Sequence, residues 1–276
     1  MKVSPKSSTG VKPFQFRSYG VSVEITSDSQ EIIDRAAAIS KASLLGNLTK
    51  FSGKKADHTF VLNKTPGDRY VMDQNGERVT YARSARKFFK FFDSILRVSV
   101  GEYSPDRVFM HAGVVGWKGE AILIPADSFK GKSTLVAELV RQGAEYYSDD
   151  FAIFDADGMV HAFPRTLAMR ADDGKFSPYE LTVDDLSGTV GAEPIPVGHV
   201  LFTGYEKGKR WSPKILSPGE GVLGMIPFTL PMSYRPEFAF RVLNKIARRA
   251  IITSSSRGTA EKFAKTLLNF VDKHTN

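Results

Sequence analysis

A glycine-lysine-serine loop between an apolar run and an amphipathic segment constrains this chain more than any other feature. The apolar run covers residues 121–124, the loop ends in Gly-Lys-Ser-Thr at residues 131–134, and apolar side chains then recur at Leu135, Leu139 and Val140. Such a run is typical of a buried strand, and such a recurrence is typical of an amphipathic helix. The segment therefore predicts a strand, a loop and a helix in direct succession.

The end of this loop matches the phosphate-binding (Walker A) pattern G-x-x-x-x-G-K-[ST]. In that pattern backbone N–H groups wrap a polyphosphate, the lysine reaches its β and γ oxygens, and the serine hydroxyl holds Mg²⁺. Lys132 and Ser133 would take these roles, and the positive end of the following helix would also favour an anion. The predicted nucleotide-binding residues are Ala126, Asp127, Ser128, Phe129, Lys130, Gly131, Lys132, Ser133 and Thr134.

Two departures from the pattern leave the strength of nucleotide binding open. Ala126 stands where the pattern has its first glycine, and Phe129 and Lys130 add bulk inside the loop. If residue 126 needed a left-handed backbone, alanine would cost roughly 1–2 kcal/mol. Either the backbone at Ala126 is ordinary, or nucleotide binding is weaker than usual. The remaining alternative is a helix start that carries Gly-Lys-Ser by accident.

Two adjacent carboxylates follow the next predicted strand. Gly143 ends the helix, residues 144–147 form a short apolar strand, and Ser148, Asp149 and Asp150 come directly after it. Neighbouring residues of a strand point to opposite sides, so one carboxylate could face a metal and a nucleotide while the other faces an acceptor or a structural partner. The alternative is a solvated turn built on two aspartates.

Separately placed features within residues 108–170 agree with one known family. They are His111-Ala112 on a strand, Asp127-Ser128 within the loop, the helix pattern L-x-x-x-L-V-x-x-G and the Ser-Asp-Asp sequence. The segment resembles the HPr kinase/phosphorylase group and the related HPr-kinase-like serine kinases, in which the histidine and the second aspartate have the same spacing from the loop. This agreement is more specific than a Walker motif alone.

The resemblance implies an α/β fold, with a P-loop catalytic domain of the HPr-kinase/PEP-carboxykinase type, a mixed sheet and a tendency to form homo-oligomers. It implies that Lys132 and Ser133 bind the phosphates and Mg²⁺. It also implies that Asp150 accepts the proton of the substrate hydroxyl, and that His111 and Asp149 support the site, Asp149 as a further metal ligand.

Three features of the family are missing or have no assigned position. They are the full glycine set of the loop, a downstream metal-binding glutamate and the arginine-bearing loop of the phosphate-removing reaction. Asp172, Asp173 or Glu180 could replace the glutamate, and no motif selects among them.

Arg165 and Arg170 could reach a phosphate or pair with surface carboxylates. We therefore expect the kinase reaction and leave the reverse reaction, and HPr as the substrate, unassigned.

The part of the chain before this segment carries no chemical signature. Residues 1–13 are polar, lack the apolar stretch of a secretory signal and are expected to be flexible. Residues 14–25 alternate like one half-buried strand, residues 30–45 predict a helix, and short strands follow. A helix over residues 82–100 carries apolar side chains expected to pack in a core: Phe88, Phe89, Phe91, Phe92, Ile95 and Leu96.

A change from helix to strand near Pro105 predicts a domain boundary. It separates a small α+β domain, residues 14–103, from a kinase-like domain, residues 104–276. In the second domain the polar residues 176–195 suggest a loop or lid near the site. The basic side chains within residues 205–213 serve either solubility or the attraction of phosphates and acidic acceptors.

A second glycine pattern, G-x-G-x-x-G at residues 219–224, matches a dinucleotide-binding fingerprint by its letters alone. A dinucleotide site needs a strand directly before the pattern and a long helix after it, whereas prolines stand on both sides here. We expect instead a short helix capped by Ser217 with Pro218 at its first position.

Composition excludes several classes of protein and site. The 276 residues contain no cysteine, which excludes disulfides, thiolate metal sites and a cysteine nucleophile and fits a cytoplasmic protein. No apolar run approaches the roughly 18 residues of a membrane span, so we expect no membrane partner.

The net charge of +8 permits nucleic-acid binding, but the basic residues are spread out and no aromatic reader motif is present. A basic surface equally suits a nucleotide and an acidic substrate.

Together these observations predict an ATP- and Mg-dependent kinase that transfers the γ-phosphoryl group to a hydroxyl. The expected acceptor is a serine of a protein or peptide. One alternative is a small-molecule kinase, for example one that acts on a free amino acid, which would share every site residue. The other is a catalytically degenerate scaffold, which would bind nucleotide without turnover.

Overall fold

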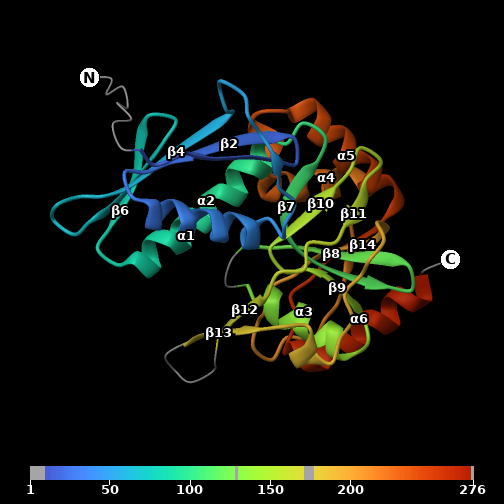
Figure 1. The fold of residues 1–276 in the computed structure, drawn as a ribbon. Coiled ribbons are helices and arrows are strands. Elements are labelled where there is room, and N and C mark those ends of the chain that lie inside the picture. The colour runs from blue at the N-terminus through green and yellow to red at the C-terminus, as the bar shows by residue number, and fades with distance from the viewer. Residues whose placement is uncertain (1–9, 128–129, 171–176, 275–276) are drawn as a thin grey trace. The chain divides into compact units, whose positions relative to one another are not determined.

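The computed structural model describes residues 10–127, 130–170 and 177–274. The chain forms two compact units, Met1–Asp106 and Arg107–Asn276. Each unit combines helices with a sheet of parallel and antiparallel strands, so the chain has a mixed α/β fold (Figure 1).

Among its described residues, the first unit holds a six-stranded sheet in the order β3-β1-β2-β4-β5-β6. The strands are β1 (Phe14–Ser18), β2 (Val21–Thr26), β3 (Thr49–Lys50), β4 (His58–Lys64), β5 (Tyr70–Gln74) and β6 (Glu77–Ala82). Only β2 and β4 pair in parallel within this described sheet. The helices α1 (Gln30–Ser43) and α2 (Ala85–Tyr103) cover one face and bury a common core with it (Figure 1).

The start of the first sheet shows how alternation and turn chemistry act together. Val21, Val23 and Ile25 are buried in alternation, as the sequence predicts for a strand with one face on a core. The prediction of a single strand over this stretch is wrong, because Tyr19 and Gly20 have φ values of +45° and +79° and reverse the chain into a hairpin. The apolar residues stand at even positions before the turn, at Phe14 and Phe16, and at odd positions after it, so this change of phase marks the break that a single strand would not show.

Helix α2 supplies most of the aromatic part of this core. Ser84 caps the helix by accepting a hydrogen bond from the amide of Lys87. Phe88 and Phe92 are fully buried, which confirms that the aromatic stripe packs inside the unit. The expectation for Phe91 is wrong, since it is 41% exposed at the side of the stripe.

Among its described residues, the second unit holds an eight-stranded sheet in the order β11-β10-β7-β8-β14-β16-β15, with β9 paired to β7 and β11 also paired to β14. These strands are β7 (Val108–Trp117), β8 (Glu120–Pro125), β9 (Glu145–Ser148), β10 (Phe151–Phe154), β11 (Met159–His161), β14 (Ile195–Phe202), β15 (Lys214–Ile215) and β16 (Ile251–Ser254). The longer helices are α3 (Lys132–Arg141), α4 (Pro218–Met225), α5 (Pro236–Arg249) and α6 (Ala260–His274), and the short turns η2 (Ile226–Phe228) and η3 (Leu230–Ser233) precede α5.

Two separate hydrophobic cores lie on the two faces of this sheet. Residues of α4 and α5 bury one core with it, and residues of α3 and α6 bury the other (Figure 1). The strand, loop and helix predicted around the glycine-lysine-serine sequence are β8, the connection that follows it and α3. Gly143, with φ of +96°, follows α3 as the sequence predicts for a helix stop.

The expectation of a loop over residues 176–195 is wrong for part of its described stretch. β13 (Pro178–Leu181) pairs with β12 (Leu167–Arg170), and the 3₁₀ turn η1 (Asp184–Leu186) follows. β13 is largely exposed, so its sequence lacks the apolar alternation by which a strand is recognised.

The second glycine pattern forms α4, and the predicted capping is confirmed. Ser217 accepts a hydrogen bond from the amide of Glu220, whose side chain accepts one from the amide of Ser217 in return. Pro218 occupies the first helical position. This geometry accounts for the stretch without a dinucleotide.

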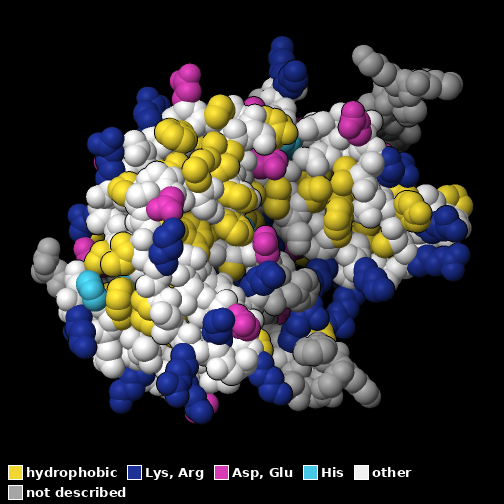
Figure 2. All heavy atoms as spheres, turned by 180° about the vertical axis from the view of Figure 1, so that it is seen from behind, with side chains coloured by type: hydrophobic (Ala, Val, Ile, Leu, Met, Phe, Trp, Pro, Cys, Tyr) yellow, Lys and Arg dark blue, Asp and Glu magenta, His cyan; other side chains and the backbone are white. Residues whose placement is uncertain are grey.

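The surface shown in Figure 2 carries scattered lysine and arginine side chains, in line with the dispersed basic residues of the sequence. Within the described residues, none of the helices has the length and apolar character that a membrane crossing requires.

Candidate functional site

The carboxyl ends of three parallel strands meet at one edge of the second sheet. β14 pairs in parallel with β8 on one side and with β16 on the other. The three strands end at Pro125, Phe202 and Ser254. Ligands of open α/β sheets bind in the crevice beyond such ends. The connection from β8 to α3 therefore lies beside the loops that follow β14 and β16.

Antiparallel strands bring the histidine and the two carboxylates to the same edge. Ala112 of β7 pairs with Pro125 of β8, so His111 lies next to the start of the β8–α3 connection. β9 runs antiparallel to β7 and ends at Ser148, and Phe151 of the following strand pairs with His111. Asp149 and Asp150 lie between these two pairings and thus beside the histidine.

The β8–α3 loop, defined as residues 126–131, has an ordinary backbone at its alanine. Ala126 is buried, and it does not belong to the described residues with positive φ. Gly131 has a left-handed backbone, with φ of +78°. Its carbonyl accepts a hydrogen bond from the amide of Leu135, in the first turn of α3, at 3.1 Å. The strain that alanine could have caused in this loop is therefore absent at Ala126.

The other predicted residues of the loop and helix start fall into two groups. Three of them are solvent-exposed or half-buried: Asp127, Lys130 and Thr134. Ser128 and Phe129 lie outside the described residues. Asp172 and Asp173, named above as alternatives to the missing glutamate, also lie outside them.

Lys132 and Asp149 form a buried pair at the centre of the site. Their side chains are 6% and 8% exposed, and Lys132 Nζ lies 3.4 Å from Asp149 Oδ1. Lys132 Nζ also donates to the backbone carbonyl of Asp149. Burial raises the pKa of Asp149, while the charge of Lys132 and a hydrogen bond from Ser133 act in the opposite direction. The lysine of the loop is thus tied to the carboxylate that follows β9.

Ser133 and Asp149 bring two oxygen donors together. The hydroxyl and the carboxylate are hydrogen-bonded to each other, and both oxygen types suit Mg²⁺, which often binds to one or two carboxylates plus substrate phosphates. Among the described residues no group of three or more His, Asp or Glu side chains could hold a metal by itself. Two protein oxygens of types that suit Mg²⁺ are therefore available at this position.

Asp150 is half-buried and faces an arginine. Arg165 Nε lies 3.9 Å from Asp150 Oδ2, and the carbonyl of Arg165 accepts the hydroxyl of Tyr146 at 2.7 Å. The hydroxyl of Ser148 accepts the amides of Asp150 and Phe151 at 3.2 and 3.1 Å, which fixes the turn that presents the carboxylate. Arg165 thus pairs with a predicted site residue.

His111 lies within the same group of charges. Its ring hydrogen-bonds to the backbone of Ala126 and interacts electrostatically with Lys132, Asp150 and Asp127. Burial, and then the charge of Lys132, lower the pKa of His111. The imidazole is therefore held neutral at physiological pH.

Two other sequence candidates lie on the paired strands β12 and β13. Glu180 lies on β13 and accepts the hydroxyl of Thr166 at 3.1 Å. Arg170 ends β12. No described contact links Glu180 to the pair formed by Lys132 and Asp149.

Arg257 contacts the loop and was not singled out by any sequence pattern. It lies after β16, and its Nη2 donates to the carbonyl of Gly131 at 2.7 Å. Only its position directly after the last strand, beyond Ser254, could have suggested that it reaches this edge.

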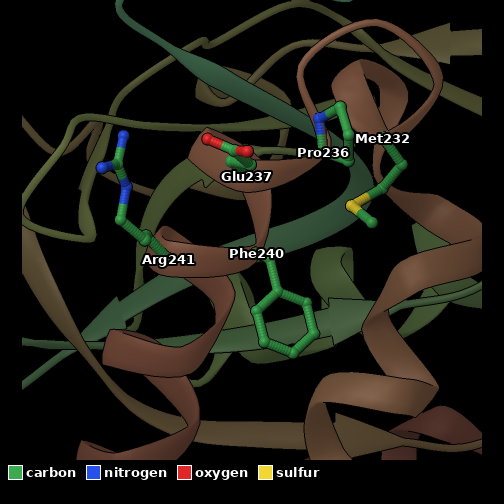
Figure 3. A pocket seen from close by; sticks show the side chains of 5 residues that line it. All are labelled: Met232, Pro236, Glu237, Phe240 and Arg241. Carbon is green, nitrogen blue, oxygen red and sulfur yellow. The ribbon is translucent and has the colours of Figure 1, made fainter.

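A separate apolar pocket lies on η3 and α5, with a volume of about 450 Å³. Figure 3 shows the side chains that line it, none of which is a predicted site residue: Met232, Pro236, Glu237, Phe240 and Arg241. The candidate site is therefore defined by converging polar groups and not by this cavity.

Comparisons with known proteins add little to this geometry. No family model matches the chain, and no curated protein matches it. Among solved structures, the Hpr(Ser) kinase/phosphatase from Coxiella burnetii matches with 11% sequence identity and a TM-score of 0.34, covering 60% of this chain and 95% of that chain. The functional assignment below therefore depends on the site itself.

Proposed function

We propose that this protein is an ATP- and Mg-dependent kinase of the HPr-kinase-like type, which transfers the γ-phosphoryl group to a serine hydroxyl of a protein or peptide. The observation that supports it is the convergence of a helix-start lysine and serine with two carboxylates and a neutral histidine at one sheet edge. Anion-binding amides, a cation and a proton acceptor are the groups that phosphoryl transfer requires.

The amide groups of the β8–α3 loop and the start of α3 bind the triphosphate in this proposal. Lys132 reaches the β and γ oxygens, where its charge offsets the charge that develops on the transferred group. Lys132 contacts Asp149, and in this proposal a bound phosphate would replace part of that contact.

Ser133 and Asp149 hold Mg²⁺ in this proposal, completed by phosphate oxygens. When bound there, the ion would supply positive charge that offsets the charge of the phosphates. The buried position of Asp149 favours such a use, because a cation nearby stabilises the ionised carboxylate against the cost of burial.

Asp150 accepts the proton of the acceptor hydroxyl. The hydroxyl oxygen forms a bond to the γ-phosphorus, the bond from that phosphorus to the bridging oxygen of ADP breaks, and the proton passes to the carboxylate. The turn fixed by Ser148 holds Asp150 in place, and Arg165 orients its carboxylate. His111, kept neutral by burial, orients groups of the site without adding charge.

A basic segment beside the loop favours an acidic peptide as the acceptor. The amide of Tyr205 donates to the carbonyl of Lys130 at 3.4 Å, so residues 205–210 lie next to the β8–α3 loop. Lys207, Lys209 and Arg210 are exposed in this segment. Complementary charge increases the rate of encounter with an acidic partner.

The test uses the full-length protein, labelled ATP and Mg²⁺, with one pool of serine-containing peptides and one pool of free amino acids and metabolites. We expect label in the peptide pool. Asp150→Asn should lower kcat by about 10²–10⁴-fold, because it removes the proton acceptor, and leave nucleotide affinity nearly unchanged. Asp157→Asn is the matched control, since Asp157 is exposed and pairs only with Lys245 among the described side chains.

Each other outcome has a defined meaning. Label in the metabolite pool alone would identify a small-molecule kinase with the same site. Nucleotide binding without turnover, unchanged by Asp150→Asn, would indicate a scaffold protein. Failure of the wild-type protein to bind any nucleotide would refute the proposed function.

A further inference from the structure

Arg257 is a buried basic residue to which the proposed reaction assigns no role. It lies in the turn between β16 and α6 and is only 2% exposed. Its amide donates to the carbonyl of Gly204 at 3.0 Å, and its carbonyl accepts the amide of Glu206 at 2.8 Å. These bonds join the turn after β16 to the loop after β14.

The guanidinium of Arg257 extends from this turn to the β8–α3 loop. Its Nη2 donates to the carbonyl of Gly131 at 2.7 Å, and its Nη1 donates to the carbonyl of Gly258 at 3.0 Å. The Gly131 carbonyl also accepts the amide of Leu135. Two donors therefore hold the one loop residue whose left-handed backbone starts α3.

A charged donor on this carbonyl strengthens the adjacent amide. The carbonyl of Gly131 and the N–H of Lys132 belong to one peptide group, and a hydrogen bond to the oxygen polarises that group. Amides at this point of the pattern wrap the phosphates. Arg257 thus acts on the loop without touching a ligand directly.

The charge of Arg257 has no counter-charge in the described residues. Its guanidinium donates there to two backbone carbonyls and lies 5.8 Å from the centre of the Phe263 ring, and its Nε has no hydrogen-bond partner. Burial lowers the pKa of Arg257 to about 10, so the group remains charged at neutral pH. A buried charge without an anionic partner is costly, and a polyphosphate beside the loop would supply the negative charge that the described residues do not.

We infer that Arg257 is a positioning residue of the nucleotide site, which holds the β8–α3 loop through Gly131 and whose charge is balanced by bound phosphates. The inference rests on the proposed function. It requires that the contribution of Arg257 to affinity grows with the number of phosphates on the ligand. A merely structural role would affect all nucleotides equally.

The experiment measures binding of adenosine, AMP, ADP, ATP and inorganic tripolyphosphate to the full-length protein by calorimetry in the presence of Mg²⁺. Arg257→Gln should lower the affinity for ATP and tripolyphosphate by at least about tenfold, and the affinity for adenosine by less than about twofold. The KM for ATP should rise by a similar factor. Arg249→Gln is the matched control, because Arg249 is exposed and pairs with Glu120, and it should change none of the affinities.

A second variant covers the case in which Arg257→Gln does not fold. Arg257→Lys keeps the positive charge but loses the paired donors of the guanidinium. It should therefore lower the affinity for ATP by an intermediate factor and leave the affinity for adenosine unchanged. Equal losses for adenosine and ATP in the folded variant, or no loss at all, would overturn the inference. In both cases the wild-type protein still binds ATP, whereas failure of the wild type to bind would refute the proposed function instead.

Discussion

Replacing Lys132 by methionine is the sharpest test of the buried pair at the site. Methionine fills a similar volume but removes the charge that faces Asp149 at 3.4 Å. The carboxylate then stays buried with the hydroxyl of Ser133 as its remaining side-chain donor among the described contacts of the pair. We expect a large loss of stability together with the loss of nucleotide binding.

The magnitude follows from the burial of both partners. Side chains that are 6% and 8% exposed are little screened by water, and removing one partner of a buried pair costs roughly 3–5 kcal/mol. For a unit of this size, 1 kcal/mol corresponds to about 2–4 °C in Tm, so the variant should melt roughly 6–20 °C lower.

The loss should depend on pH in a defined direction. Burial already raises the pKa of Asp149, and without the lysine that pKa rises further. A group whose pKa is raised by folding stabilises the folded state at low pH, and this contribution is lost as the pH rises through the folded pKa. The difference in the free energy of unfolding between the wild type and Lys132→Met should therefore become smaller as the pH falls, because the protonated carboxyl of Asp149 needs no cation beside it.

Unfolding by urea, followed by circular dichroism, measures this deficit for the wild type and the variants. The double variant Lys132→Met/Asp149→Asn should recover a large part of the lost stability, since it removes the unpaired charge. Lys245→Met is the control, because its pair with Asp157 is exposed and should contribute at most about 1 kcal/mol. A deficit below about 1 kcal/mol for Lys132→Met, or no recovery in the double variant, would refute the reasoning.

Two further predictions concern a buried histidine and the glycine at the start of α3. Burial, and then the charge of His274, lower the pKa of His199 from 6.5 to about 4, so about 3 kcal/mol of stability should be lost as the pH falls through this range. Urea titrations of His199→Asn should show a shallower pH dependence, and identical slopes for both proteins would contradict this. Gly131→Ala should cost roughly 1–2 kcal/mol and weaken ATP binding, because its φ is +78° and a β-carbon would lie 3.0 Å from Arg257 Nη2. Gly208→Ala has a similar φ and open space around it, so it should cost similar stability and keep ATP affinity; equal ATP affinities in both variants would count against the prediction.

Local patterns of the sequence were sufficient for the elements that carry the site. The apolar run of β8, the helical spacing in α3 and the stop at Gly143 lie within a few residues of one another, and each appears in the structure as predicted. The capped start of α4 at Ser217 is of the same kind. Such features depend on backbone hydrogen bonding and side-chain spacing inside one segment, which the sequence contains completely.

Predictions from such local patterns were wrong at three places in the chain. At Tyr19-Gly20 the apolar alternation changes phase, which the prediction of one continuous strand did not take into account, and the exposed strand β13 has no apolar face by which to recognise it. Phe91 has the composition of its buried neighbours but lies beside their stripe. The backbone conformation decides the first case, and the degree of burial decides the other two.

By itself the sequence determined a glycine-lysine-serine loop between strand and helix, a carboxylate pair after the next strand, and a chain without cysteine. Only the tertiary structure decided that Lys132 contacts Asp149, that Arg165 pairs with Asp150, and that Arg257 reaches Gly131. These contacts join segments up to 126 residues apart along the chain. The parallel register of β8, β14 and β16 and the antiparallel pairing of β9 and β10 with β7 bring these separate strand ends to one edge, and no local pattern encodes this arrangement.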